Sequence, residues 1–311
     1  LLSFRGATHF YLIKYLAYKR FFEKHDFKTI STVDENSPAM RSILDAARIC
    51  GIKTIGIQHG NIHDLHPAYL YSPEDIRRNA VPDHTLIWGE FWKDFLMNKG
   101  NYPAEGLHVC GQIRTDVIPG LPGSGTSKEK LPGIDSSKKL IVFASQPQRD
   151  PELRKRAALD VIRAVKDIHE GFLFIKLHPN EKNDKAYYQE LAEEVGLKNL
   201  KISLDVDLYL LISACDVLVT CFSTVGTETV YFNKPLIILD HLKQDIQNYH
   251  KEGVAFQASN MEELEMHLKE ILDGKKQINT KAYSQFIEKY AFAIDGKASE
   301  RALQVIERLG G

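Results

Sequence analysis

The chain has 311 residues, of which 43% are hydrophobic and 26% are charged. This length suits one large domain or two ordinary ones, and such a chain buries a sufficient core without disulfides or metals. Lys and Arg number 40 and Asp and Glu number 41, which gives a net charge of −1. This balance argues against generic nucleic-acid binding, because such binding depends on neutralising phosphates.

The cysteines and the apolar runs indicate a cytoplasmic protein. Cys50, Cys110, Cys215 and Cys221 lie in or beside apolar runs, and no CxxC pair occurs, so we expect a reducing compartment. No secretory signal is visible, and no apolar run approaches the roughly 18 residues that span a bilayer. Because residue 1 is Leu and not Met, the sequence is compatible with a piece trimmed from a longer protein.

Residues 1–24 are rich in aromatic and basic side chains and have a helical pattern. Over residues 1–28, six Lys or Arg stand against Glu23 and Asp26. Two interpretations remain open for this segment. It is either a packed helix with a solvated basic edge or an interfacial helix that rests peripherally on anionic lipid, at the inner face of the membrane.

Strands alternate with helices along the rest of the chain, which predicts parallel sheets. In the first half, Ser37 and Pro38 have the residue types that begin a helix, and Gly51 ends it. The expected strands there are 27–33, 53–57, 85–88 and 108–110, with a helix at 91–99. In the second half the expected strands are 140–144, 172–177, 200–202, 217–220 and 236–239, and the expected helices are 151–169, 186–195, 208–214, 226–232, 261–273 and 281–309.

A Pro-, Gly- and Ser-rich stretch at residues 118–137 separates the two halves, and we interpret it as a linker. The prediction is an α/β protein with two Rossmann-like domains that face each other across a cleft. The first domain covers 1–117 and the second covers 138–290, and a C-terminal helix covers 291–311.

Five polar clusters directly follow predicted strands. They are Asp34-Glu35, Gln58-His59-Gly60, Ser145-Gln146, His178-Pro179 and the run from Ser223 to Glu228. Since ligands of open parallel sheets bind at the carboxyl ends of the strands, these clusters predict a binding site.

The run from Ser223 to Glu228 has the residue types of an anion site. Ser223, Thr224, Gly226 and Thr227 are small and stand between a strand and a helix, where free backbone N–H groups suit a phosphate. Glu228 could accept from ribose hydroxyls. The alternative interpretation is plain helix capping by Ser223 or Thr224.

Two histidines and an acidic pair are the catalytic candidates. Pro179 keeps His178 extended, so its imidazole could bind a phosphate or protonate a leaving group. His59 stands beside Gly60 as a candidate general base. Asp34 and Glu35 could serve as a base or bind the acceptor, or they could merely cap the following helix.

We expect neither a metal nor a bound cofactor. Asp205-Val206-Asp207 has the DxD spacing of metal-dependent glycosyltransferases, but it opens a helix, where acidic residues satisfy free N–H groups. His59, His63 and His66 lack the further ligands of a zinc site.

Several stretches together resemble GT-B glycosyltransferases, and more narrowly the CDP-glycerol glycerophosphotransferases and related capsule and surface-polysaccharide transferases. The similar segments are GIQHGN (56–61), GQIRTD (111–116), IKLHPNE (175–181), residues 205–240 and DGKASERALQVI (295–306). The acidic pair with His-Pro and Ser-Thr is also similar to bacterial sialyl- and polysialyltransferases.

The resemblance implies a metal-independent transferase that moves a glycosyl or polyol-phosphate group from a CMP-, CDP- or UDP-linked donor to a surface-polysaccharide or lipid-linked acceptor. It makes 1–117 the acceptor-side domain, which is short for this fold, and 138–290 the domain that binds the nucleotide donor. It assigns chemistry to His59 and His178 and donor binding to Ser223, Thr224 and Arg114. We expect Ser145, Gln146 and Glu228 to contact the donor as well. Gln58 replaces a Trp, and Ile113 replaces a Pro of the glycerophosphotransferases, which favours a CMP-sugar or another nucleotide sugar. The base stays open between Asp34 and His59. The alternatives are a nucleotide-sugar 2-epimerase and a non-catalytic nucleotide-binding domain of a larger polymerase.

Overall fold

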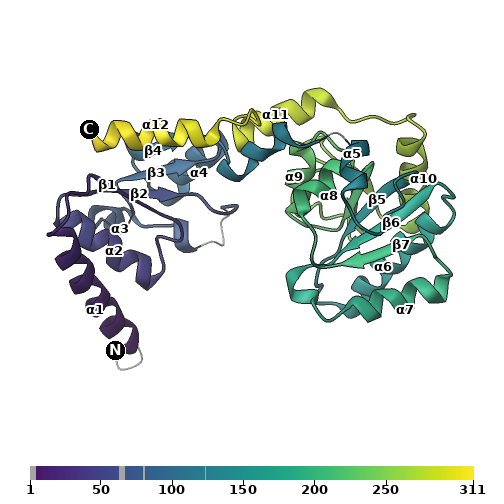
Figure 1. Cartoon of the computed structure of the whole chain (residues 1–311), viewed down its shortest axis with the longest axis horizontal. Coiled ribbons are helices and arrows are strands. Elements are labelled where there is room, and N and C mark those ends of the chain that lie inside the picture. Colours follow the sequence, from purple (N-terminus) through teal and green to yellow (C-terminus); the bar gives the residue numbers. More distant parts are fainter. Residues whose placement is uncertain (1–4, 63–66, 80, 123) are drawn as a thin grey trace. The chain divides into compact units, whose positions relative to one another are not determined.

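The computed structural model describes residues 5–62, 67–79, 81–122 and 124–311, and the chain forms two compact units (Figure 1). Unit 1 combines Leu1–Pro119 with Glu288–Gly311, and unit 2 is Gly120–Ile287. Each unit is built around one parallel β-sheet with helices on its faces. The α/β class predicted from the sequence is therefore correct.

Unit 1 contains a four-stranded parallel sheet in the order β1-β2-β3-β4. Its strands are β1 (Thr29–Thr32), β2 (Lys53–Ile57), β3 (His84–Ile87) and β4 (Leu107–Val109). Its helices are α1 (Arg5–Phe22), α2 (Pro38–Ile49), α3 (Pro73–Arg77), α4 (Glu90–Gly100) and α12 (Ala298–Gly310), with 3-10 turns η2 (Pro67–Tyr69), η3 (Ala104–Gly106) and η4 (Ile113–Gly120). Ser37 caps α2 by accepting from the backbone N of Met40, as its position before Pro38 predicts.

Both faces of this sheet are buried, because neighbouring residues of a strand point to opposite faces. In β3, Ile87 packs with Trp92 and Leu96 of α4 on one face. Leu86 packs on the other face with Ala302 of α12. The last helix of the chain thus completes the core of the first sheet, and Figure 1 shows it in yellow along the strands.

Two of the segments that carry the family resemblance, 111–116 and 295–306, hold α12 against the sheet by hydrogen bonds. Asp116 accepts from the backbone N of Ala298 (2.8 Å) and of Ser299 (2.7 Å), so it satisfies free N–H groups at the start of α12. Arg301 of α12 donates to the carbonyl of Cys110 at 2.8 Å and pairs with Asp295. The turn at 111–116 and the segment 295–306 are therefore one structural element of unit 1.

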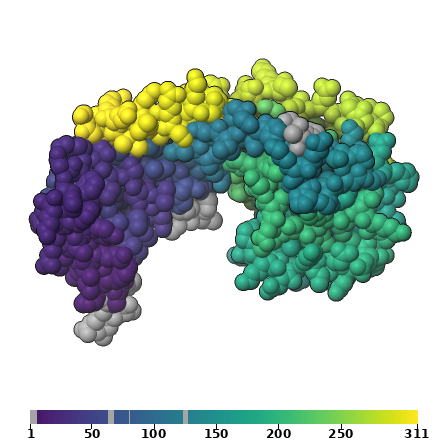
Figure 2. All heavy atoms as spheres, in the orientation of Figure 1, coloured from purple at the N-terminus to yellow at the C-terminus, as the bar shows by residue number. Residues whose placement is uncertain are grey.

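Helix α1 packs on α2 with one side only. Tyr15, Tyr18 and Phe22 lie in a cluster with residues of α2 and β1, whereas the opposite side is at the surface (purple in Figure 2). Four apolar side chains there are about half exposed: Phe10, Leu12, Ile13 and Leu16. Among the helices that the structure describes, none is long and apolar enough to cross a bilayer.

Unit 2 contains a six-stranded parallel sheet in the order β10-β9-β8-β5-β6-β7. Its strands are β5 (Lys139–Ala144), β6 (Gly171–Lys176), β7 (Leu200–Ser203), β8 (Val217–Thr220), β9 (Leu236–Leu239) and β10 (Phe256–Ala258). Its helical segments are α5 (Ser124–Glu129), α6 (Pro151–Lys166), η5 (Pro179–Glu181), α7 (Lys185–Val195), α8 (Leu208–Ala214), α9 (Val225–Tyr231), α10 (Met261–Leu272) and α11 (Thr280–Ala291), of which α11 ends in unit 1.

This strand order is the doubly wound Rossmann order, in which the chain moves outward from β5 in one direction and then from β8 in the other. Helices α6, α7 and α10 bury apolar residues against one face of the sheet, and α8 and α9 contact β5, β8 and β9. The topological switch point lies between β5 and β8. Ligands of such sheets bind at this point, outside the carboxyl ends of the strands.

Three expectations from the sequence differ from the structure. The stretch 118–137 contains α5, whose Ser127 and Lys128 are buried and contact Ser213 and Asp216, so much of it is packed within unit 2. The single helix expected at 281–309 is divided into α11 and α12, because Phe292 and Gly296 adopt left-handed backbone angles. The short strand β10 was not expected.

Candidate functional site

The carboxyl ends of β5, β6 and β8 are neighbours in the sheet of unit 2, at and beside its switch point. Three of the polar clusters predicted from the sequence follow these strands directly: Ser145-Gln146 after β5, His178-Pro179 after β6, and the run from Ser223 to Glu228 after β8. The structure thus brings these clusters to one edge of one sheet, as the alternating pattern predicts.

His178 is held in one orientation by its own loop. Its backbone is extended, with φ −68° and ψ 148°, as expected before a proline. The side-chain Nδ1 accepts a hydrogen bond from the backbone N of Asn180 at 3.1 Å. Because Nδ1 is an acceptor, a neutral ring carries its proton on Nε2. The half-exposed imidazole can therefore donate from Nε2 to an anion.

Ser145 lies beneath this loop. Its side chain is 3% exposed, and its hydroxyl donates to the carboxylate of Glu181 at 2.5 Å. Glu181 also accepts from the backbone N of His178 at 3.2 Å. The hydroxyl of Ser145, a predicted donor contact, supports the loop here, and its contact with a donor stays a prediction. Glu181 was missed, although its position three residues after His178 is that of a capping box.

Gln146 joins the loops on the two sides of the switch point. Its side-chain oxygen accepts from the backbone N of Phe222 at 2.8 Å and lies 3.3 Å from the hydroxyl of Thr220. This side chain therefore fixes the loop after β8 relative to the end of β5, and its contact with a donor stays a prediction.

The run from Ser223 to Glu228 is partly occupied by internal contacts. The hydroxyl of Ser223 accepts from the backbone N of Val225 at 3.2 Å, whereas Thr224 is exposed and makes no side-chain cap bond. The hydroxyls of Thr227 and Tyr249 are 2.9 Å apart. A Cβ on Gly226 would lie 2.7 Å from the ring of Tyr249, so close packing requires the glycine. Of the predicted donor contacts in this run, Thr224 is the most accessible.

Glu228 is buried within its helix, and the second Asp of the DxD sequence caps a helix. The side chain of Glu228 is 4% exposed, within α9. Asp207 accepts from the backbone N of Tyr209 and of Leu210 at 2.9 and 3.0 Å, so it is the N-cap of α8, as the sequence predicts. Asp205 is exposed in the preceding turn.

In unit 1, the acidic pair follows β1 and its two members have opposite environments. Asp34 is exposed, with a left-handed φ of 55°. Glu35 is 2% exposed, and burial raises the pKa of its carboxyl to about 7. Only Asp34 is accessible to a bound molecule in this conformation.

His59 follows β2 and is exposed. The amide of Gln58 holds its turn, since it donates to the carbonyl of Gly60 at 3.0 Å and accepts from the backbone N of Trp88 at 2.9 Å. The Nδ1 atom of His59 lies 3.3 Å from the hydroxyl of buried Tyr69. If Nδ1 carries the proton and donates to Tyr69, Nε2 is left as a base. His63 and His66 lie outside the described residues.

Arg114, the remaining predicted donor contact, is an exposed residue of η4 in unit 1. It lies beside the buried amide of Gln112, whose oxygen accepts from Arg114 Nε at 2.6 Å when the amide is oriented to suit its neighbours.

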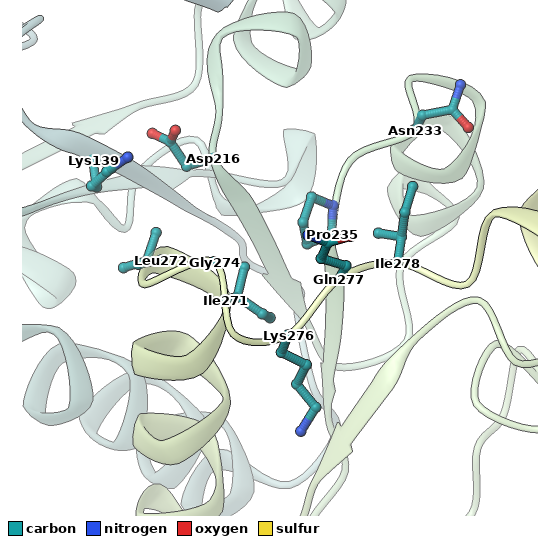
Figure 3. A pocket seen from close by; sticks show the side chains of 10 residues that line it. All are labelled: Lys139, Asp216, Asn233, Pro235, Ile271, Leu272, Gly274, Lys276, Gln277 and Ile278. Carbon is teal, nitrogen blue, oxygen red and sulfur yellow. The ribbon is translucent and has the colours of Figure 1, made fainter.

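A cavity of about 310 Å³ in unit 2 lies at the other edge of the sheet. It is lined by Lys139, which begins β5, and by Asp216 and Pro235, which precede β8 and β9 (Figure 3). These are the amino ends of the strands. The cavity is therefore separate from the edge that carries His178 and Thr224.

Comparison with known proteins shows the family and the fold. The model of the CDP-Glycerol:Poly(glycerophosphate) glycerophosphotransferase family matches residues 52–308. The uncharacterized protein MJ1060 of Methanocaldococcus jannaschii is 27% identical over 202 residues, which are 62% of this chain and 34% of that protein. The chain thus spans about a third of the length of this curated relative.

Solved structures share the fold at low identity. UDP-GlcNAc 2-epimerase from Neisseria meningitidis bound to UDP-GlcNAc has a TM-score of 0.63 and 15% identity, over 97% of this chain and 82% of that one. A putative UDP-N-acetylglucosamine 2-epimerase from Listeria monocytogenes has a TM-score of 0.67 and 13% identity, over 97% of this chain and 79% of that one. The wall teichoic acid polymerase TagF has a TM-score of 0.59 and 14% identity, over 83% of this chain and 68% of that one.

These neighbours are GT-B type enzymes with two Rossmann-like domains, so the predicted α/β fold with two Rossmann-like domains is confirmed. The family model covers most of the chain, and it includes the His-Gly, His-Pro and Ser-Thr segments on which the resemblance depends. The chain belongs to the CDP-glycerol:poly(glycerophosphate) glycerophosphotransferase family.

Proposed function

We propose that the chain is a transferase that moves a glycosyl or polyol-phosphate group from a CMP-, CDP- or UDP-linked donor to a surface-polysaccharide or lipid-linked acceptor. Membership of the glycerophosphotransferase family supports a nucleotide-activated donor. The observation that carries the proposal is the imidazole of His178, which is fixed through Nδ1 and stands beside the switch point of a Rossmann sheet.

In this proposal unit 2 binds the donor. His178 donates from Nε2 to a phosphate oxygen of the donor and stabilises the negative charge that develops when the nucleotide leaves. Thr224 is exposed on the neighbouring loop and supplies a hydroxyl to the same phosphates. A hydrogen-bond donor that points at the charge developing in the transition state raises kcat by about 10²–10³-fold.

In unit 1, His59 or Asp34 removes the proton of the acceptor hydroxyl. The acceptor oxygen then bonds to the transferred group, the bond from that group to the nucleotide phosphate breaks, and the nucleotide departs with the electron pair. Both candidate bases are exposed, which favours them over buried Glu35. We propose that this step uses no metal, because the carboxylate of Asp207 in the DxD sequence accepts hydrogen bonds from backbone N–H groups at the N-terminus of α8.

We also propose that the protein works at the cytoplasmic face of a membrane, with α1 on anionic lipid. The exposed Leu12, Ile13 and Leu16 support this, since basic Arg20 and Lys24 follow them on the same stretch of chain. The test is sedimentation with phosphatidylserine vesicles. Leu12→Glu with Leu16→Glu should abolish binding, and binding by the double variant equal to the parent would contradict the proposal.

The experiment that tests the donor proposal is a thermal-shift panel. Binding of a ligand to the folded state raises the melting temperature, so CDP, CMP, UDP, CDP-glycerol and UDP-GlcNAc are compared at equal concentration. We expect a cytidine or uridine nucleotide to stabilise the protein. No shift with any of the five would contradict nucleotide binding. Conversion of UDP-GlcNAc to its 2-epimer would instead identify an epimerase.

A further inference from the structure

The carboxylate of Glu181 lies behind the His178 loop and is almost fully buried, with a side chain that is 1% exposed. Four donors from four different segments of unit 2 surround its two oxygens. They are Ser145 Oγ at 2.5 Å, the backbone N of His178 at 3.2 Å, Tyr188 Oη at 2.9 Å and Arg154 Nη2 at 2.8 Å.

The two oxygens of this carboxylate have different tasks. Oε1 accepts from Tyr188 of α7 and pairs with Arg154 of α6, so it anchors the group in the helical layer. Burial and the adjacent carboxylate raise the pKa of Tyr188, which keeps its phenol protonated as a donor. Oε2 accepts from Ser145 and from His178, and it therefore joins the end of β5 to the end of β6.

We propose that Glu181 is a positioning residue for His178. Oε2 holds the backbone N of His178, and the ring then reaches the backbone N of Asn180 through Nδ1. The carboxylate thereby selects the tautomer with the proton on Nε2. It does not touch the donor. The role in transfer rests on the proposed function, whereas the control of the ring is a property of the protein without ligand.

Glu181→Gln is the variant that tests this role. The amide keeps the size of the side chain but offers one acceptor oxygen and an NH₂ group to four donors. The matched control is Tyr188→Phe, which removes one neutral donor from Oε1 and leaves both contacts of Oε2 in place.

The first measurement is the ¹⁵N NMR spectrum of the His178 ring without nucleotide. We expect the parent and Tyr188→Phe to have the Nε2–H tautomer and Glu181→Gln to have a mixture of tautomers. Unchanged ring signals in Glu181→Gln would overturn the proposal. If Glu181→Gln does not fold, Glu181→Asp, whose shorter side chain withdraws the carboxylate from the backbone N of His178, takes its place with the same criterion.

The second measurement is a double-mutant cycle on CDP affinity. Glu181→Gln should weaken CDP binding about tenfold in the parent, the scale of a hydrogen bond to a charged group, and less than twofold in a His178→Ala background. Equal losses in both backgrounds would mean that Glu181 acts on the fold and not through His178. If CDP does not bind the parent, the nucleotide of the thermal-shift panel that does bind takes its place. If none of them binds, the proposed function fails, and the ring spectra still decide the positioning role.

Discussion

The buried carboxyl of Glu35 predicts a pH-dependent stability of unit 1. This side chain is 2% exposed, and neither of its oxygens has a hydrogen-bond partner in another described residue. A Cβ on neighbouring Gly56 would lie 3.3 Å from Oε1, so the carboxyl is closely packed. Burial disfavours the charged form and raises the pKa of Glu35 from 4.5 to about 7.

The sign and size of the effect follow from these two pKa values. The folded state binds the proton of Glu35 more tightly than the unfolded state does. Its stabilising contribution is therefore complete below pH 4.5 and is lost as the pH rises to about 7. The difference between the two pKa values corresponds to about 3 kcal/mol of unfolding free energy. Glu35→Gln, which has no charge to bury, should lack this dependence.

Tryptophan fluorescence during urea unfolding is a suitable assay, because both tryptophans of the chain, Trp88 and Trp92, are buried in unit 1. The free energy of unfolding of Glu35→Gln relative to the parent should increase by about 2–3 kcal/mol between pH 5 and pH 8, because a part of the effect is already present at pH 5. Glu105→Gln, which changes an exposed carboxylate of the same unit, is the matched control. An equal difference between parent and Glu35→Gln at both pH values would refute the reasoning.

Three further predictions concern the site. Gly226→Ala should destabilise unit 2 by about 1–3 kcal/mol, because the new Cβ would meet the ring of Tyr249. An unchanged midpoint of thermal unfolding, followed by circular dichroism, would contradict this packing. EDTA should leave CDP binding intact, because the carboxylate of Asp207 caps α8. A loss of CDP binding that added Mn²⁺ reverses would overturn the proposal of metal-independent transfer. Of His59→Ala and Asp34→Asn, the variant that removes the base should lose about 10²–10⁴-fold in turnover and keep its CDP affinity, and parental turnover in both would exclude both residues as the base.

The strands were largely predictable from the sequence. Strands β2, β8 and β9 begin and end at the predicted residues, because each is a short apolar or β-branched run between clear breaks. The division of the last helix was missed, although Asp295-Gly296 has the composition of a turn. Strand β10 was missed, whereas β4, which is equally short and also lies at the edge of its sheet, was predicted to within one residue.

The candidate site was predictable in position but not in detail. The sequence indicates which strands end in polar residues, and the parallel sheet brings those ends together. It does not indicate which hydroxyl or amide is used internally. Ser145 and Gln146 are occupied by Glu181 and Phe222, and such contacts between residues far apart in the chain have no local sequence signal. The burial of Glu35 beside exposed Asp34 likewise depends on packing.

The central claim is that unit 2 binds the phosphates of a nucleotide through His178, and β6 offers a matched pair of histidines to test it. His178 follows the carboxyl end of this strand, whereas exposed His169 precedes its amino end. The decisive measurement is calorimetric titration of CDP into the parent, His178→Ala and His169→Ala. We predict that His178→Ala binds CDP about tenfold more weakly and that His169→Ala binds it like the parent. Equal affinity in all three proteins would contradict the claim.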